Sequence, residues 1–130
     1  MSQIALSPPA FGGASAALNF SAGVVSNGHV FVTGMTGSAL DGSMSEDPAE
    51  QFRNAWEKIA LVLAEAGLGL DTIVEMTTYH IGLRDHFDLF DQVRLDHLSA
   101  PYPAWTAVEV AGLRREGALV EIRVIAALPA

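Results

Sequence analysis

Residues 48–81, PAEQFRNAWEKIALVLAEAGLGLDTIVEMTTYHI, decide the fold of this chain. Apolar residues recur at spacings of three and four along the first half of the stretch, which predicts an amphipathic helix ending at the segment GLG. Ser45 or Asp47 can cap this helix, and Pro48 suits its first turn. The β-branched and aromatic residues of 73–81 then predict a strand that follows the helix.

The segments on either side of this unit extend the pattern. Residues 20–34, FSAGVVSNGHVFVTG, contain two apolar runs around Asn27-Gly28, a pair that accepts the backbone of a tight turn, so they predict a β-hairpin. After the strand at 73–81, Asp85 is placed to cap a second helix that continues to about Leu98. The order so far is hairpin, helix, strand, helix.

Two further strands are expected at the end of the chain, over Ala104–Val110 and Ala118–Ala127. The glycines that flank the segment between them favour a reversal, so we expect these strands to pair as a second hairpin. The whole pattern predicts an α+β fold in which a mixed sheet carries both helices on one face. Residues 1–18 form a surface lead-in in this interpretation, and residues 19–130 form a single domain.

Composition excludes several functions. The net charge is −8 and only 7 of 130 residues are Lys or Arg, which argues against binding to nucleic acid. There is no cysteine, so disulfides, thiolate nucleophiles and Cys-ligated metals are excluded. The first twenty residues match neither a signal peptide nor a membrane anchor, and we expect a cytoplasmic protein with no membrane association. Half of the residues are hydrophobic, which favours self-association.

Three stretches together resemble the RidA/YjgF family of enamine and imine deaminases: the glycine-bounded hairpin, the run EQFRNAWEKIALVLAEAGLGLDTIVEMTTYHIGLRDHFDLFDQV, and the closing PAWTAVEVAGLRREGALVEIRVIA. The resemblance covers about residues 19–128. It implies a chorismate-mutase-like α+β sandwich that assembles as a homotrimer with clefts between subunits. Family members hold the carboxylate of a 2-imino acid with the arginine of a Pro-Ala-Arg motif, and Trp105 occupies that position here.

The resemblance also assigns roles to other positions. Glu121 falls on the glutamate thought to position or activate water, and Gly34 lies in the small-residue turn beside the cleft. Phe20 stands where a tyrosine is usual, Asp91 where an asparagine is frequent, and Ala107 where some members carry cysteine. The implied site therefore keeps the glutamate, Glu121, but lacks most of the other polar side chains of a 2-imino-acid site.

The chemistry of Trp105 suggests an altered substrate preference. An indole has one N–H donor and cannot replace the two-pronged grip of arginine on a carboxylate, but its flat surface suits an aromatic or uncharged ligand. If Val110 lies opposite Ala118 in the closing hairpin, Trp105 faces Arg123. Arg123 would then return a cation to the cleft and lower the pKa of the Glu121 carboxyl.

Each assignment has a structural alternative. Glu121 can be an ordinary solvated strand glutamate, and Asp91 can belong to a solvated acidic helix face. Trp105 can fill the pocket or anchor a subunit interface, and Phe20 can be core. The four histidines lack the spacing of a metal site, and no cofactor is implied.

Two functions remain in competition. The first is a RidA-like hydrolase of an imine or enamine, in which Glu121 positions water. The second is a trimeric protein that binds a small ligand without turnover. A third function, suggested by ribonuclease reports for some relatives, conflicts with the acidic balance of the chain.

Overall fold

The helix and the strand expected within residues 48–81 are both present in the computed structural model, which describes residues 3–130. Helix α2 spans Pro48–Ala64, and the Asp47 carboxylate accepts a hydrogen bond of 3.1 Å from the backbone N–H of Ala49. This bond satisfies one of the donors that a helix start leaves open. Strand β4 spans Ile73–His80 and follows a short 3-10 turn, η2 (Leu70–Thr72).

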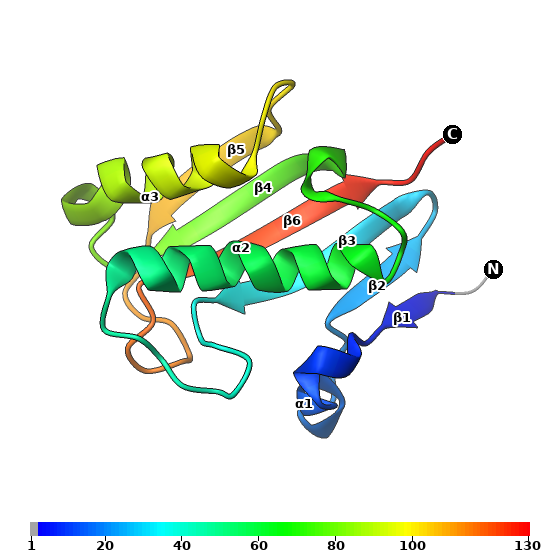
Figure 1. The fold of residues 1–130 in the computed structure, drawn as a ribbon, viewed down its shortest axis with the longest axis horizontal. Coiled ribbons are helices and arrows are strands. Elements are labelled where there is room, and N and C mark those ends of the chain that lie inside the picture. The colour runs from blue at the N-terminus through cyan, green and yellow to red at the C-terminus, as the bar shows by residue number, and fades with distance from the viewer. Residues whose placement is uncertain (1–2) are drawn as a thin grey trace.

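The sheet has six strands in the order β1-β2-β3-β6-β4-β5 (Figure 1). Strands β4 and β5 run parallel and all other neighbours run antiparallel, so the predicted mixed sheet is confirmed. The remaining strands are β1 (Ile4–Leu6), β2 (Gly23–Ser26), β3 (His29–Thr36), β5 (Ala104–Glu109) and β6 (Val120–Ala127).

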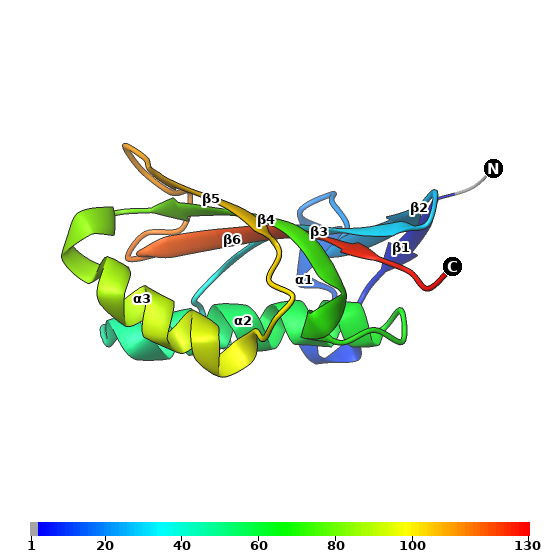
Figure 2. The same cartoon turned by 90° about the horizontal axis from the view of Figure 1, so that it is seen from above.

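Helices α2 and α3 (Leu83–His97) cover the same face of the sheet, as predicted, and Figure 2 shows both of them below it. The largest fully buried side chains, including Trp56, Phe52 and Phe90, come from these two helices and pack between them and the sheet. The N-terminal turn η1 (Pro9–Phe11) and the short helix α1 (Ala14–Ala17) complete the elements.

The hairpin expected around Asn27-Gly28 is confirmed. Ser26 pairs with His29, and both turn residues have positive φ, 50° for Asn27 and 77° for Gly28. Asparagine and glycine are the residues that adopt such angles at least cost, which is why this turn could be recognised from its two letters.

The closing hairpin was predicted wrongly. Strand β5 does not pair with β6; it lies at the edge of the sheet, parallel to β4, while β6 is inserted between β3 and β4. Because α3 carries the chain from the end of β4 back to its start, the next strand has to run parallel to β4. Residues 110–119 then form a connection that crosses β4, which local glycine signals do not reveal.

The start of α3 also differs from the expectation. The helix begins at Leu83, two residues before Asp85, and its N-cap is Gly82. The carboxylate of Glu109, at the end of β5, accepts hydrogen bonds from the backbone N–H groups of Gly82 at 3.0 Å and Leu83 at 2.6 Å. A side chain distant in sequence therefore takes the capping role that had been assigned to Asp85.

The first residues are more than a lead-in. Within 1–18, strand β1 pairs antiparallel with β2 and extends the sheet at its edge. Leu6 contributes to the core from this strand. A strand of three residues carries too little periodicity to be recognised from sequence.

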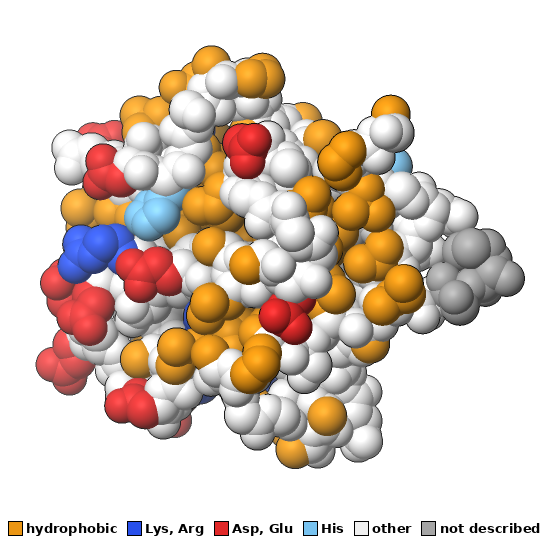
Figure 3. Space-filling view, turned by 45° about the vertical axis from the view of Figure 1, so that its right-hand side comes forward, with side chains coloured by type: hydrophobic (Ala, Val, Ile, Leu, Met, Phe, Trp, Pro, Cys, Tyr) orange, Lys and Arg blue, Asp and Glu red, His pale blue; other side chains and the backbone are white. Residues whose placement is uncertain are grey.

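The face of the sheet away from the helices is partly apolar. Phe31 is 39 % exposed there, between its cross-strand neighbours Val24 and Ile125. In Figure 3, hydrophobic side chains also gather toward the side where β1 and the end of α2 lie, and acidic ones gather where α2 and α3 begin. None of the helices within residues 3–130 is long and apolar enough to cross a membrane.

Candidate functional site

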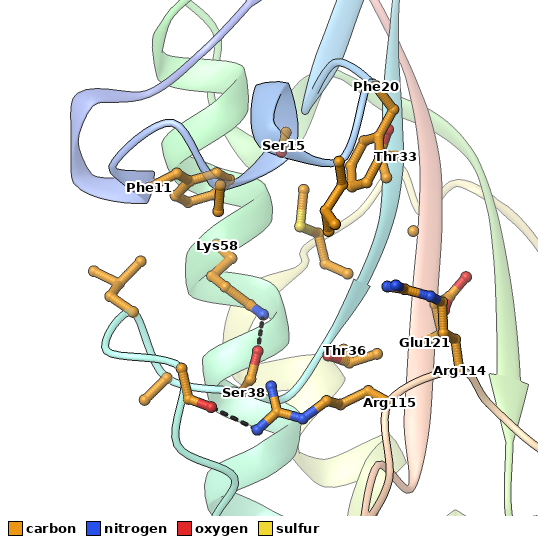
Figure 4. Close-up of a pocket in the computed structure, with 17 residues that line it drawn as sticks. Phe11, Ser15, Phe20, Thr33, Thr36, Ser38, Lys58, Arg114, Arg115 and Glu121 are labelled. Atoms are coloured by element: carbon orange, nitrogen blue, oxygen red, sulfur yellow. Dashed lines mark hydrogen bonds between the residues drawn. The ribbon is translucent and has the colours of Figure 1, made fainter.

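A cavity opens beside the second half of β3. Strand β2 pairs with β3 only as far as Val32, so the edge of β3 beyond that residue has no strand neighbour. The N-terminal segment with η1 and α1 lies over this free edge and closes the cavity, whose volume is about 430 Å³ (Figure 4). We call this space the Glu121 cavity. Its side chains include Phe11, Leu18, Phe20, Met35, Ser38, Leu40, Lys58, Arg114, Arg115 and Glu121.

Three residues that the family resemblance assigned to the site meet in this cavity: Phe20, Gly34 and Glu121. The Glu121 side chain lies across Gly34 so closely that a Cβ atom on Gly34 would stand 2.3 Å from Oε2 and 2.8 Å from Cγ of Glu121. Only glycine leaves room for the carboxylate in this place. The structure places Thr33-Gly34-Met35 within β3 and not in a turn, and the glycine of this segment is explained by the position of Glu121.

Phe20 lines the cavity from the segment before β2. Its side chain is 45 % exposed, so it is a wall of the cavity and not the core residue considered as an alternative. The segment is held in place by Thr33, whose hydroxyl donates a 2.6 Å hydrogen bond to the carbonyl of Ser21.

A polar stripe on α2, made of Gln51, Asn54 and Lys58, holds the segments around the cavity, and Lys58 itself lines the wall. Gln51 is buried and hydrogen-bonds the carbonyls of Ser45 and Gly117 and the N–H of Leu119. This side chain therefore fixes both the loop before α2 and the 110–119 connection. One and two turns later, Asn54 and Lys58 bind the segment that follows β3.

Lys58 is the only lysine in the chain, and it is half-buried. Its ammonium donates a 2.9 Å hydrogen bond to the hydroxyl of Ser38. Burial and the nearby positive charge of Arg115 lower the pKa of Lys58 to about 8. The Arg115 guanidinium donates to the carbonyl of Gly42 across the mouth of the cavity.

Trp105 does not share this cavity. It lies on β5, on the face that the helices cover, where it is stacked on Phe87 with ring centroids 5.6 Å apart. The guanidinium of Arg94 stands 4.7 Å from the centroid of the indole, and Phe90 packs beside it at 6.0 Å. We call Trp105, Phe87, Phe90 and Arg94 the Trp105 layer. These contacts favour the alternative in which the indole fills space inside the protomer.

The single N–H of the indole is also occupied. It donates a 2.9 Å hydrogen bond to the hydroxyl of Thr78, which lies 2.7 Å from Nε2 of His80. Nδ1 of His80 lies 3.3 Å from Nε2 of His86. Burial lowers the pKa of His80 to about 4 and also lowers that of His86. A neutral, hydrogen-bonded chain of side chains therefore leads from Trp105 to the start of α3.

Ala107 and Asp91 lie on the same side as the Trp105 layer. Ala107 is two residues after Trp105 on β5 and lies beside Thr78 of β4. Asp91 makes an ion pair of 2.8 Å with Arg94, one turn later on α3. Neither residue lines the Glu121 cavity.

The expected pairing of Arg123 with Trp105 is wrong. Arg123 lies opposite Thr77 and Trp105 lies opposite Met76, so the two side chains project from opposite faces of the sheet. The error follows from the misassigned hairpin, because β4 separates the two strands. Arg123 is exposed and does not line the cavity.

Six polar residues of the cavity were not predicted: Ser15, Thr36, Ser38, Lys58, Arg114 and Arg115. Lys58 carried one signal, since it is the only lysine of the chain, but the segment that its side chain contacts depends on how the loop after β3 folds. Within residues 3–130, no group of three or more His, Asp or Glu side chains is arranged to hold a metal ion.

Comparisons with known proteins agree with this architecture. A family model described as endoribonuclease L-PSP matches residues 13–128. The RutC family protein YjgH of Escherichia coli K12 is 38 % identical over 111 residues, which cover 85 % of this chain and 83 % of that protein.

Solved structures with the same fold include YjgH, with a TM-score of 0.90 and 33 % identity over 100 % of this chain and 99 % of that one. The RidA protein of the Antarctic bacterium Psychrobacter sp. PAMC 21119 has a TM-score of 0.80 and 29 % identity, covering 85 % and 89 % of the two chains. Escherichia coli TdcF, solved with bound serine, has a TM-score of 0.78 and 26 % identity, covering 85 % and 88 %.

Proposed function

We propose a function from one premise: the chain belongs to the RidA/YjgF family, whose family model is described as endoribonuclease L-PSP. On this premise the chain is a small-molecule hydrolase of the enamine and imine deaminase type. One observation carries the proposal: Phe20, Gly34 and Glu121 line a single cavity, and Gly34 makes room for the carboxylate. A carboxylate kept at the edge of a small cavity is suited to accept a proton from water.

The reaction needs little besides this carboxylate. Water adds to the carbon of a protonated C=N bond while Glu121 accepts a proton from the water, and a carbinolamine forms. The carbinolamine nitrogen then takes this proton from Glu121, the C–N bond breaks to release ammonia, and the hydroxyl group loses its proton as the carbonyl compound forms. An enamine enters the same sequence after it takes a proton at carbon and becomes an imine.

The complete site is an inter-subunit cleft of a homotrimer in this proposal. Within one protomer the assigned residues fall into two groups, one in the Glu121 cavity and one around the Trp105 layer. Contact between protomers would complete the Glu121 cavity, while the Trp105 layer stays inside its protomer, and the exposed Phe31 side chain supports self-association. Light scattering should give three times the protomer mass of 13.7 kDa.

Deamination can be tested with 2-iminobutanoate or 2-iminopropanoate generated in situ, by following release of the 2-oxo acid with and without protein. Glu121→Gln should reduce the protein-dependent rate about 10²–10⁴-fold, because the amide does not accept the proton. Gly34→Ala should reduce it as well, because the new methyl group displaces the carboxylate.

Glu116→Gln is the matched control. Glu116 is an exposed glutamate of the 110–119 connection that precedes β6 and does not line the Glu121 cavity, so its variant should keep the native rate. Equal rates in Glu121→Gln and the native chain would contradict the proposal.

The second candidate is a trimer that binds a small ligand without turnover. It is favoured by the Trp105 layer, where the family holds a carboxylate with arginine. The indole N–H is already donated to Thr78, and the nearest guanidinium, Arg94, is already paired with Asp91. Ligand binding without any acceleration of imine hydrolysis would support this candidate.

A further inference from the structure

The cations of this chain are unevenly distributed. Three of its seven Lys and Arg residues, Lys58, Arg114 and Arg115, line the Glu121 cavity, and Glu121 is the only Asp or Glu among the lining residues. The cavity is thus locally cationic in a chain whose net charge is −8. Such a local excess raises the concentration of small anions at the cavity.

The Lys58 ammonium lacks an anionic partner. Among residues 3–130, no Asp or Glu oxygen lies within 4.0 Å of its Nζ, and the hydrogen bond that the ammonium donates goes to the neutral hydroxyl of Ser38. A half-buried ammonium beside a guanidinium is poorly stabilised, as the lowered pKa of Lys58 also indicates. An anion placed between Lys58 and Arg115 would relieve this repulsion.

The donors around this point converge. In Figure 4, Lys58 from α2 and Arg115 from the 110–119 connection approach Ser38 from two sides. The Ser38 hydroxyl accepts a hydrogen bond from Lys58, so its own hydrogen remains available for donation. Both walls are rigidly held, because Gln51 ties α2 to the connection and packs against Gly37.

The rest of the cavity lining indicates the chemical character of the group attached to the anion. Apolar side chains dominate the remaining lining, and the volume of about 430 Å³ accommodates a small molecule. The apolar side chains are Phe11, Ala14, Leu18, Phe20, Met35, Ala39 and Leu40.

We infer that Lys58, Arg115 and Ser38 form a subsite for the carboxylate of a small apolar 2-oxo or 2-imino acid, in the Glu121 cavity. The subsite takes over the anion-binding role that Trp105 cannot fill. Naming the acid as a substrate rests on the proposed function, whereas binding of the carboxylate does not. In Figure 4, Glu121 stands on the wall across from Lys58, so a bound acid would present its reactive carbon between them.

Calorimetry on the 130-residue chain with 2-oxobutanoate tests the subsite. Lys58→Met and Arg115→Gln should each weaken binding about tenfold or more, the usual loss when a charge-assisted hydrogen bond is removed. Lys58→Arg keeps the charge and should retain affinity within a few-fold, which separates loss of charge from loss of packing. The neutral 2-oxobutanamide should bind more weakly and should not distinguish the variants.

Arg53→Gln is the matched control, because Arg53 is an exposed cation on the same helix that does not line the cavity. Its affinity should equal that of the native chain. Unchanged affinity in Lys58→Met, or no detectable binding of 2-oxobutanoate to the native chain, would overturn the subsite. If binding depends on Lys58 but no imine is hydrolysed, the subsite is supported and the proposed hydrolysis fails. If imine is hydrolysed at the same rate in Lys58→Met as in the native chain, the hydrolysis is supported and the subsite fails.

Discussion

The Glu121 cavity and the Trp105 layer lie on the same sheet but are built in opposite ways. The cavity borders a free strand edge, and its residues include a half-exposed phenylalanine, a cation without a carboxylate partner and a glycine kept bare for a carboxylate. In the Trp105 layer, the indole N–H and the Arg94 guanidinium both have partners inside the protomer: the indole N–H binds Thr78, and Arg94 binds Asp91.

This difference separates residues that are free to bind a ligand from residues already committed to the fold. Unsatisfied or poorly solvated groups at a cavity are available to a ligand, whereas satisfied groups in a packed layer contribute to stability. We therefore expect substitutions in the layer to change the free energy of unfolding, and substitutions in the cavity to change binding and turnover.

The largest expected effect is a loss of stability in Trp105→Ala. Removing the indole takes away its stacking on Phe87, its contact with Phe90 and its hydrogen bond to Thr78, at a cost of about 3 kcal/mol. Phe20→Ala removes a side chain that is 45 % exposed and should cost less than about 1 kcal/mol. Urea denaturation at one fixed protein concentration measures both values.

Trp105→Phe provides the control for this comparison, since it keeps an aromatic ring against Phe87 but loses the indole N–H. It should fall between the native chain and Trp105→Ala. Equal losses in Trp105→Ala and Phe20→Ala would break the distinction between layer and cavity.

The second effect is a fall in stability as the pH drops from 7 to 5. The pKa of His80 is about 4 in the folded chain, below its ordinary value of 6.5, so the unfolded chain binds more protons between these values. The contribution to stability is full above pH 6.5 and is lost as the pH falls toward 4. Between pH 7 and pH 5 the free energy of unfolding should fall by about 2 kcal/mol from His80 alone.

Urea denaturation at the two pH values checks this expectation. His80→Gln should flatten the dependence, whereas His29→Gln, at an exposed histidine on the β2–β3 hairpin, should leave it unchanged. His86 and Glu109 act in the same direction, because their pKa values are also lowered, by burial for His86 and by the hydrogen bonds to Leu83 and Gly82 for Glu109. If the native protein were equally stable at pH 5 and pH 7, His80 would not be held in its neutral form in the folded state.

Local patterns were sufficient for much of the fold. Helix α2, the turn at Asn27-Gly28 and strand β4 each depend on neighbours within a few residues, and each was predicted. The pairing of β5 depends on where α3 returns the chain, which is a non-local choice. The capping of α3 by Glu109 is non-local as well, since Glu109 lies 26 residues after Leu83, the first residue of the helix.

The site divides in the same way. The resemblance led to Phe20, Gly34 and Glu121, and the structure brings them together. The subsite of Lys58, Ser38 and Arg115 could not be predicted. Its residues come from α2, the loop after β3 and the 110–119 connection, and these segments meet only in the folded chain, where Gln51 ties α2 to the connection. Arg123 was misplaced for one reason, which was the register of a hairpin that does not form.

The smallest expected change in stability is that of Asp91→Asn. This variant also tests whether the Trp105 layer is separate from the ligand site. Asp91 and Arg94 form a partly exposed ion pair within one turn of α3, a kind of pair that contributes about 0.5 kcal/mol or less. Asp91→Asn should therefore leave the free energy of unfolding nearly unchanged, because Arg94 keeps its contact with the Trp105 ring. If Asp91 acts only within its protomer, the KM for an imine substrate should not change either. A raised KM with unchanged stability would instead show that Asp91 faces a cleft completed by a neighbouring protomer, and the layer would then belong to the site.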